Sequence, residues 1–214
     1  NYYYSDLPKG FQITQQFHPI GRDGYVIIHT ENGDKKIGIE RIHMEEDTAK
    51  QFHLREQSLL DYNRAGTPLI EIVSRPDMSS GEEAQAYVEA IRETLYYIGV
   101  SDVKMEEGSL RCDTNVSIKP KGSTVLGTKN EIKNLNSIAN IGKAVDYEVQ
   151  RQKAILESGE KVIQETRRFD DETKTTVAMR RKEGNVDYKF FPEPNIFPIR
   201  LDPEWIKKIQ DAMP

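Results

Sequence analysis

The chain has 214 residues, of which 30% are charged and 36% hydrophobic, and 30 Lys and Arg against 35 Asp and Glu give a formal net charge of −5. This composition excludes a disordered acidic tail and a strongly basic nucleic-acid coat protein. No apolar run approaches the roughly 18 to 20 residues of a membrane-spanning helix, so we expect no membrane association. The single cysteine, Cys112, excludes an internal disulfide and is typical of a reducing compartment, so we expect a cytoplasmic protein.

The first third of the chain predicts β-structure. Residues Tyr25–His29 and Lys36–Ile42 are strand-like and flank the pair Asn32-Gly33, which is the strongest short-range signal for a β-hairpin. A further strand is predicted over Thr67–Ser74, where β-branched and apolar residues lie between two prolines.

Two amphipathic helices are predicted in the middle of the chain. The first begins after Ser80, which forms a capping-box pattern with Glu83, and ends at Gly99. The second begins near Ser137 and ends before Gly159. Apolar residues recur at helical spacing in both, at Ala84, Tyr87, Val88, Ile91, Leu95 and Ile98 in the first and at Ile138, Ile141, Val145, Val149 and Leu156 in the second, where Gln152 lies on the same side.

Further strands are predicted on either side of the second helix. Ser109–Lys119 and Thr128–Asn134 precede it, and Lys161–Phe169 and Thr176–Arg181 follow it as a hairpin. Because hairpins recur and helices are segregated from strands, the pattern favours an α+β fold with an antiparallel sheet and flanking helices.

The last part of the chain predicts an extended tail and a short helix. Tyr188–Leu201 is rich in proline and aromatic residues, so we expect it to be extended and packed on a surface, and Pro203–Ala212 is predicted to be helical. From the sequence at both ends of the chain, we expect it to be a fragment of a larger protein.

A polar sheet surface is predicted where two strands alternate. Arg111 and Asp113 point to the side opposite Leu110 and Cys112, and Lys129, Glu131 and Lys133 form a second alternating row. An ordinary solvent-facing sheet surface has the same pattern. Two charged rows side by side would however suit a phosphate group and its metal ion. Cys112, on the apolar side, is interpreted as a small core residue.

Acidic residues near two strands are candidate metal ligands. His43–Asp47 contains an imidazole and three carboxylates, and Glu71 lies in the middle of an apolar strand. Hard divalent cations such as Mg²⁺ bind carboxylate oxygens. By spacing alone, the favoured interpretation is a solvated acidic turn, an outward-facing Glu71 and a structural His43.

No standard nucleotide-binding motif is present, neither a phosphate-binding loop of the P-loop type nor a dinucleotide fingerprint. Any chemistry with ATP would therefore need a sheet site built from carboxylates and a metal ion.

Longer motifs give the chain a resemblance to a known family. The sequence resembles the B subunits of aspartyl/glutamyl-tRNA amidotransferases over essentially its whole length. Five motifs carry this resemblance in the right order, namely His43–Asp47, Asp61–Val73, Met105–Asp113, Glu131–Ser137 and Tyr188–Pro194.

The resemblance implies a reaction, partners and a fold. In this family, ATP activates a tRNA mischarged with glutamate or aspartate to an acyl phosphate, and ammonia displaces the phosphate to give the amide. The partner amidase, which is the A subunit of the complex, supplies the ammonia from glutamine through an internal tunnel, and the small C subunit holds the other two. The resemblance thus implies ATP and Mg²⁺ as cofactors and a cradle fold similar to glutamine synthetase and guanido kinases.

The resemblance also implies roles for individual residues. Glu46 and Glu71 match the family's metal ligands, and Lys9 and Asp113 match positions along its ammonia path. From the polar sheet surface we add Arg111, Lys129 and Lys133, with Asp113, as catalytic candidates that contact phosphate or acyl phosphate. Arg111 and Lys129 are the candidates for binding ATP.

Some features depart from the family pattern. We expect residues 1–214 to be part of the cradle domain, without the family's amino-terminal segment and its carboxy-terminal helical and tRNA-binding domains. Arg75 replaces a Glu of the family, which reverses a charge near Glu71, and Gly81 replaces a Pro, which is interpreted as loop variation. The alternative hypothesis is a non-catalytic cradle fragment that acts as a scaffold or an RNA-binding module.

Overall fold

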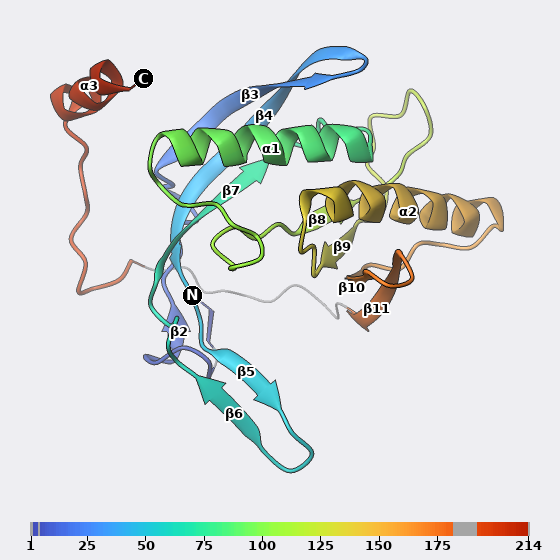
Figure 1. Cartoon of the computed structure of the whole chain (residues 1–214), viewed down its shortest axis with the longest axis horizontal. Coiled ribbons are helices and arrows are strands. Elements are labelled where there is room, and N and C mark those ends of the chain that lie inside the picture. The colour runs from blue at the N-terminus through green and yellow to red at the C-terminus, as the bar shows by residue number, and fades with distance from the viewer. Residues whose placement is uncertain (1, 4, 182–191, 214) are drawn as a thin grey trace. The chain divides into compact units, whose positions relative to one another are not determined.

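The computed structural model describes residues 2–3, 5–181 and 192–213 (Figure 1). The chain forms two compact units. Unit 1 consists of Asn1–Tyr25, Gly38–Pro76 and Val186–Pro214. Unit 2 consists of Val26–Ile37 and Asp77–Asn185. Helices and antiparallel strand pairs occur together, which confirms the predicted α+β class, whereas the likeness to a glutamine synthetase cradle stays a prediction.

A three-stranded antiparallel arrangement contains the first predicted hairpin. Strands β3 (Gly21–Thr30) and β4 (Gly33–Glu46) are joined at Asn32-Gly33, and β7 (Pro68–Ser74) pairs with β4. Gly33 has a φ of 102°, a left-handed conformation that glycine adopts without steric cost, which explains the turn at this position. The hairpin and the strand after Thr67 are therefore confirmed.

Unit 1 also contains two short strand pairs and the last helix. Strand β1 (Tyr2–Tyr3) pairs with β2 (Phe11–Gln12), and β5 (Lys50–His53) pairs with β6 (Ser58–Asp61). Helix α3 spans Pro203–Ala212, as predicted, because Asp202 caps it and proline fits its first turn.

The predicted packing of the tail is wrong for its described part. Phe197 is 89% exposed and Ile199 80% exposed, and neither lies in a helix or strand. Four prolines between positions 192 and 203 remove backbone donors, so this segment cannot pair as a strand over its length. Residues 188–191 of the predicted tail, with most of the last motif, lie outside the described residues.

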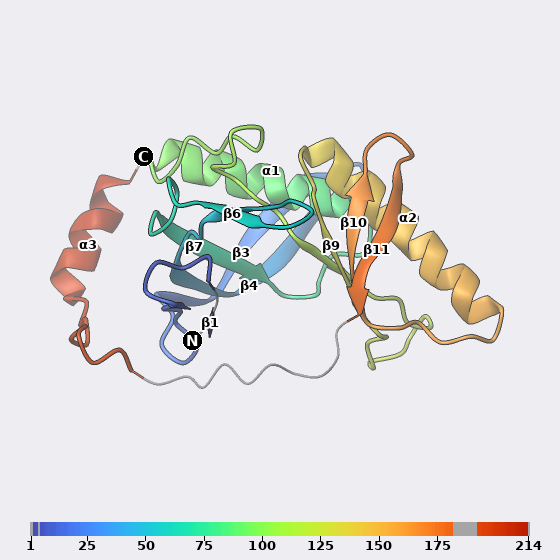
Figure 2. The same cartoon turned by 90° about the horizontal axis from the view of Figure 1, so that it is seen from below.

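The sheet of unit 2 has the order β11-β10-β9-β8, and Figure 2 labels β9, β10 and β11 in it. Its strands are β8 (Thr114–Val116), β9 (Asn130–Lys133), β10 (Glu165–Asp170) and β11 (Thr175–Arg181). The pairs β8–β9 and β10–β11 are antiparallel, but β9 and β10 are parallel, because helix α2 (Ile138–Glu157) connects them as a crossover. The prediction of a purely antiparallel sheet is therefore wrong at this pair.

The predicted strand over Ser109–Lys119 is shorter than expected. Only Thr114–Val116 pairs with β9. In this short ladder Thr114 lies opposite Ile132 and Val116 lies opposite Asn130. Upstream of this ladder, side chains still alternate between exposed and partly buried. Arg111 and Asp113 are exposed, whereas Leu110 and Cys112 are partly buried. The period-2 pattern thus predicted which way these side chains point, but not the extent of pairing.

Two helices cover unit 2. Helix α1 spans Gly81–Tyr97, and the caps of α1 and α2 are the predicted Ser80 and Ser137, whose side chains accept backbone N–H groups at 3.2 Å. The capping box at Ser80 is one-sided, however. Glu83 accepts from the backbone N–H of Ser79 at 2.5 Å instead of that of Ser80, and it also pairs with Lys35.

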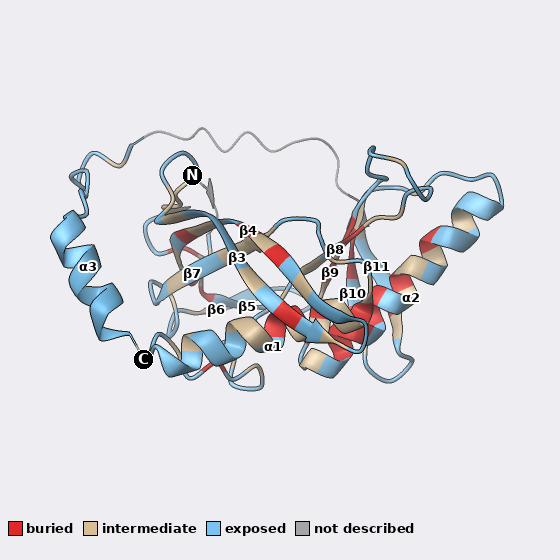
Figure 3. Ribbon diagram, turned by 90° about the horizontal axis from the view of Figure 1, so that it is seen from above, coloured by how far each residue is buried: buried red, intermediate tan, exposed pale blue. Residues whose placement is uncertain are grey.

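The apolar core of unit 2 lies where α1, α2 and the sheet meet (Figure 3). The predicted stripe of α1 is buried only in its first half, since Leu95 is half-buried and Ile98 is 46% exposed. Burial of apolar side chains stabilises this arrangement by roughly 1.5 to 3 kcal/mol for each large residue. The fully buried large apolar side chains are Ile28, Ile37, Ile132, Ile141 and Phe169.

A buried carboxylate joins α2 to the sheet. The side chain of Glu148 is fully buried and accepts hydrogen bonds from Arg151 at 2.6 and 2.9 Å, Gln152 at 2.9 Å and Thr176 at 3.0 Å. Burial alone would raise the pKa of Glu148, but these hydrogen bonds outweigh it and lower the pKa below its ordinary value. Gln152, on the predicted apolar side, also donates to the carbonyl of Val116 at 2.9 Å.

Helices α1 and α2 are in close contact at two glycines. Gly81 is the buried first residue of α1, its N–H donates to Asp146 at 3.0 Å, and a Cβ there would overlap the carbonyl oxygen of Gly142. The interpretation of position 81 as loop variation is therefore wrong, because the residue lies in a helix contact. A Cβ at Gly142 would instead meet the side chain of Gln85, with its Cδ at 2.6 Å.

We predict that Gly81→Ala lowers the free energy of unfolding by about 1–3 kcal/mol, the usual cost of overpacking. Gly142→Ala is expected to cost less, because its obstacle is the end of a flexible side chain and not backbone. Urea unfolding monitored by circular dichroism measures both values. Equal stability of Gly81→Ala and the wild-type protein would contradict this account of the helix contact.

Candidate functional site

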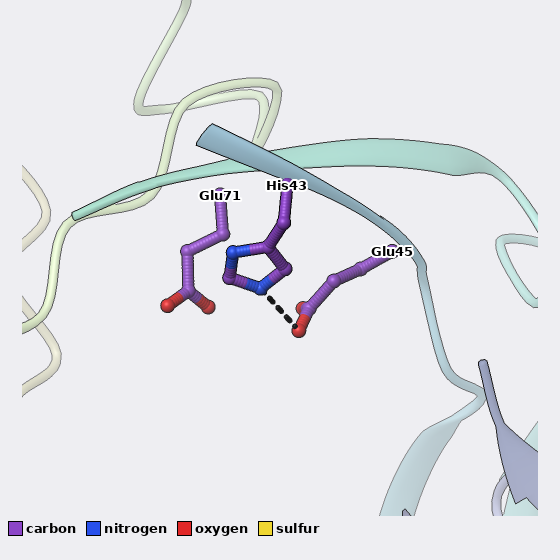
Figure 4. Close-up of side chains that lie close together, drawn as sticks. All are labelled: His43, Glu45 and Glu71. Atoms are coloured by element: carbon purple, nitrogen blue, oxygen red, sulfur yellow. Dashed lines mark hydrogen bonds and ion pairs between the residues drawn. The ribbon is translucent and has the colours of Figure 1, made fainter. Parts of the chain in front are cut away.

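The register of β4 and β7 brings three predicted residues together in unit 1. His43 lies directly opposite Glu71 in the ladder, and Glu45 follows His43 on the same face of β4. One ligand atom from each of these side chains lies within 4.8 Å of the other two. Figure 4 shows the imidazole between the two carboxylates. We call His43, Glu45 and Glu71 the carboxylate–histidine cluster.

The donor set of this cluster fits a divalent cation. His43 is buried, with 4% of its surface exposed, and its Nε2 lies 3.0 Å from Oε1 of Glu45. Its Nδ1 is buried without a hydrogen-bond partner among the described residues, which is costly for a polar atom. Two carboxylates and an imidazole nitrogen are ligands that first-row divalent metals accept, and the carboxylates suit Mg²⁺.

Glu46 lies outside this cluster, although it is one of the two predicted metal ligands. It forms an ion pair with Lys9, and its backbone carbonyl accepts from Gln12 at 2.6 Å. Successive residues of a strand point to opposite faces, so Glu45, not Glu46, shares the face of His43. The pairing of Glu46 with Glu71 at a metal stays a prediction.

Sequence reasoning gave His43 and Glu45 no specific metal role, although a signal for them was present. The spacing His43-x-Glu45 in a strand places both side chains on one face, opposite a strand that carries Glu71. The missing information was the register, because it depends on the partner strand.

The two charged rows of unit 2 lie side by side, as the alternation predicted. Lys133 donates to Asp113 at 2.7 Å and lies 3.7 Å from Glu131, which accepts from Thr166 at 3.0 Å. Partial burial would lower the pKa of Lys133, but Asp113 and Glu131 raise it overall. The charge of Lys133 is therefore already balanced by carboxylates within the sheet surface.

The other two cationic candidates are placed differently. Arg111 is exposed in the segment before β8, and Lys129 is exposed directly before β9. Both roles stay predictions. Cys112 packs against the core, and burial raises the pKa of its thiol to about 11, which agrees with its interpretation as a core residue.

The charge reversal at Arg75 has a local explanation. Arg75 donates to Asp23 at 2.5 Å, and both side chains are exposed. The added positive charge thus has its own counter-ion in unit 1. An exposed pair of this kind contributes little to stability.

A cleft of about 480 Å³ in unit 2 lies beside the end of α1 and contains none of the predicted site residues. Its lining carries two cations, Arg92 and Lys104, against four carboxylates, which are Glu89, Glu93, Asp102 and Glu106. The excess of negative charge in this lining disfavours an anionic ligand such as ATP.

Comparison with known proteins identifies the family. Residues 1–207 match the family described as "GatB/GatE catalytic domain", so the chain belongs to that family. Similar proteins are named as the B subunit of aspartyl/glutamyl-tRNA(Asn/Gln) amidotransferase. They include those of Mycoplasma mycoides subsp. mycoides SC, 58% identical over 215 residues, Staphylococcus aureus (strain MRSA252), 53% identical over 214 residues, and Lactiplantibacillus plantarum, 52% identical over 214 residues.

Each of these alignments covers 100% of this chain and 45% of the relative. The chain thus spans about half the length of the curated relatives it matches. The resemblance inferred from the five motifs is confirmed. Within the part of the chain that the structure describes, no helix has the length and apolar character to cross a membrane.

Metal titration distinguishes the two possible ligand sets. We predict that Glu45→Gln and Glu71→Gln each weaken Mn²⁺ or Mg²⁺ binding by at least about tenfold, because each removes a carboxylate ligand. Glu46→Gln is expected to change the affinity by less, because Glu46 pairs with Lys9. Isothermal calorimetry measures the affinities. A larger loss in Glu46→Gln than in Glu45→Gln would support the pair Glu46 and Glu71 instead.

Proposed function

We propose that this chain is the activation core of a tRNA amidotransferase, an ATP-dependent carbon–nitrogen ligase that works within a complex of several chains. Its substrate would be a tRNA mischarged with glutamate or aspartate, whose side-chain carboxylate attacks the γ-phosphate of ATP, so that ADP leaves and an acyl phosphate forms. Ammonia would then displace the phosphate and leave the amide. Family membership supports this class of reaction, and the carboxylate–histidine cluster is the observation that carries the proposal.

The cluster would hold Mg²⁺. A divalent cation neutralises phosphate charge and aligns an attacking carboxylate with the nucleotide, which otherwise repel each other. Glu45 and Glu71 would supply oxygen ligands, and the buried His43 would supply its unpartnered nitrogen or hold Glu45 in place. Thr14 donates to Glu45 at 3.2 Å and further limits the movement of that carboxylate.

The polar surface of unit 2 would bind the anionic groups of the reaction. Asp113 orients Lys133 through a 2.7 Å hydrogen bond, so the ammonium group is held in place before a phosphate arrives. Arg111 and Lys129 would contribute further positive charge for ATP. Their exposure and their charge support this role.

Ammonia would come from the partner amidase, and the small C subunit would complete the complex. Lys9 and Asp113 are the candidates along the route of the ammonia. Each is paired with an opposite charge, Lys9 with Glu46 and Asp113 with Lys133. Fixed pairs of opposite charge would keep such a route polar. Because each pair is neutral overall, the route would favour neither cations nor anions.

We expect Glu71→Gln in the full-length, assembled complex to lower ATP-dependent amidation by about 10²–10³-fold, the scale of losing a major electrostatic contribution. The measurement is amidated tRNA formed with ammonium as nitrogen source, which bypasses the amidase. Glu40→Gln, an exposed position of the same sheet, is the matched control and should retain activity. Amidation near the wild-type rate in Glu71→Gln would refute the metal assignment, and intact glutaminase activity would exclude misassembly.

Asp113→Ala tests the ammonia route. We expect a larger loss of amidation when glutamine supplies the nitrogen than when ammonium does, because ammonium from solvent need not travel the internal path. The ratio of the two rates is the readout, with the exposed Asp102→Ala as control. Equal losses with both nitrogen sources would point to a direct role of Asp113 and Lys133 in activation.

A further inference from the structure

The loop that connects β8 and β9 is a uniformly positive segment beside the polar sheet surface. Between Thr114 and Asn130 the sequence contains three lysines, Lys119, Lys121 and Lys129, and no acidic residue or arginine. The whole chain, in contrast, has a net charge of −5. The loop is therefore a local positive surface on an acidic protein. We call residues 117–129 the lysine loop.

The charges of the lysine loop are not neutralised within the described part of the protein. All three lysines are exposed, and none forms an ion pair or a side-chain hydrogen bond with another described residue. Nearby lysines behave differently, since Lys104 pairs with Glu107 at 2.9 Å and Lys133 with Asp113 at 2.7 Å. The loop thus presents cations whose counter-ions must come from solvent or from a bound partner.

The loop has a defined shape, although its side chains are exposed. Ser123 closes a turn, because its N–H donates to the carbonyl of Pro120 at 3.0 Å and its Oγ accepts from the N–H of Val125 at 3.1 Å. At the base of the loop, Gly127 lies so close to the carbonyl oxygen of Ile118 that a Cβ would overlap it. This contact keeps the two ends of the loop together, so that ordering it on binding costs less entropy.

The tip of the loop carries apolar side chains beside the lysines. Val125 is 74% exposed and Leu126 is 54% exposed. A partner that satisfies both features offers a chain of negative charges together with flat apolar surfaces. An RNA backbone with its sugars and bases has this chemistry, whereas a free triphosphate has the charges alone.

We propose that the lysine loop binds the phosphate backbone of the tRNA substrate, with Lys119 and Lys121 as positioning residues. This inference rests on the proposed function for the identity of the RNA. The contacts would be independent of sequence and would place the acceptor arm without reading its bases. Lys129, which directly precedes β9, stays the candidate for ATP.

The salt dependence of RNA binding tests the proposal in the full-length, assembled complex. Each phosphate contact made by a lysine contributes about 0.7–0.9 to the slope of log K against log salt concentration. Lys119→Gln/Lys121→Gln is therefore expected to lower the magnitude of this slope for a tRNA transcript by about 1.5. Lys161→Gln, an exposed lysine of unit 2 outside the loop, is the control and should leave the slope unchanged.

The outcomes separate this inference from the proposed function. A slope in the double variant equal to that of the wild-type complex would overturn the role of the loop, even if the complex amidates tRNA normally. A raised KM for ATP in the double variant, with an unchanged salt slope for tRNA binding, would also overturn it and would indicate that the loop binds ATP. The salt slope for tRNA binding could also fall in the double variant as expected, while the wild-type complex forms no amidated tRNA. That result would contradict the proposed function and leave the role of the loop intact.

Discussion

The pairing register of β4 with β7 is the constraint on which the candidate metal site depends. Glu71 reaches His43 only because these residues lie opposite each other in the ladder. A slip by one residue would turn Glu71 to the other face and leave a buried imidazole without its neighbour. The ladder shifts register between Ile39 and Arg41, and from Arg41 to Glu46 it is regular, so buried His43 and exposed Met44 keep the faces that this phase gives them. The geometry of the candidate metal site and the pairing of the two strands thus have the same physical origin here.

The packing of α2 on the sheet of unit 2 depends on the buried carboxylate of Glu148. Glu148 links α2 to β11 through Thr176, and Arg167 donates to the same Thr176 at 2.8 Å from β10. Such a group is stabilising only while every oxygen is paired, because an unpaired buried carboxylate costs several kcal/mol. Its lowered pKa means that this contribution is fully present above the ordinary pKa of a glutamate and is lost as the pH falls through the folded value.

Local signals predicted most elements, whereas features that depend on tertiary partners could not be predicted. The helix Pro203–Ala212 and the hairpin at Asn32-Gly33 follow from caps and turn residues, which act within a few positions. The site was predicted in part: Glu71 and the neighbourhood of His43 were identified, but the choice between Glu45 and Glu46 depends on strand phase. The parallel pairing of β9 with β10 and the helix contact at Gly81 depend on groups far away in sequence, so no local pattern encodes them.

The crossover from β9 through α2 to β10 has a consequence for the order of folding. The β10–β11 hairpin closes a short loop and can form early, but Glu131 and Thr166 lie 35 positions apart and meet only after α2 has docked. The parallel ladder is therefore a late event in the assembly of unit 2. Amide protons along β9 should exchange with solvent only when the whole unit opens, so the polar surface that this strand carries persists for as long as unit 2 stays folded.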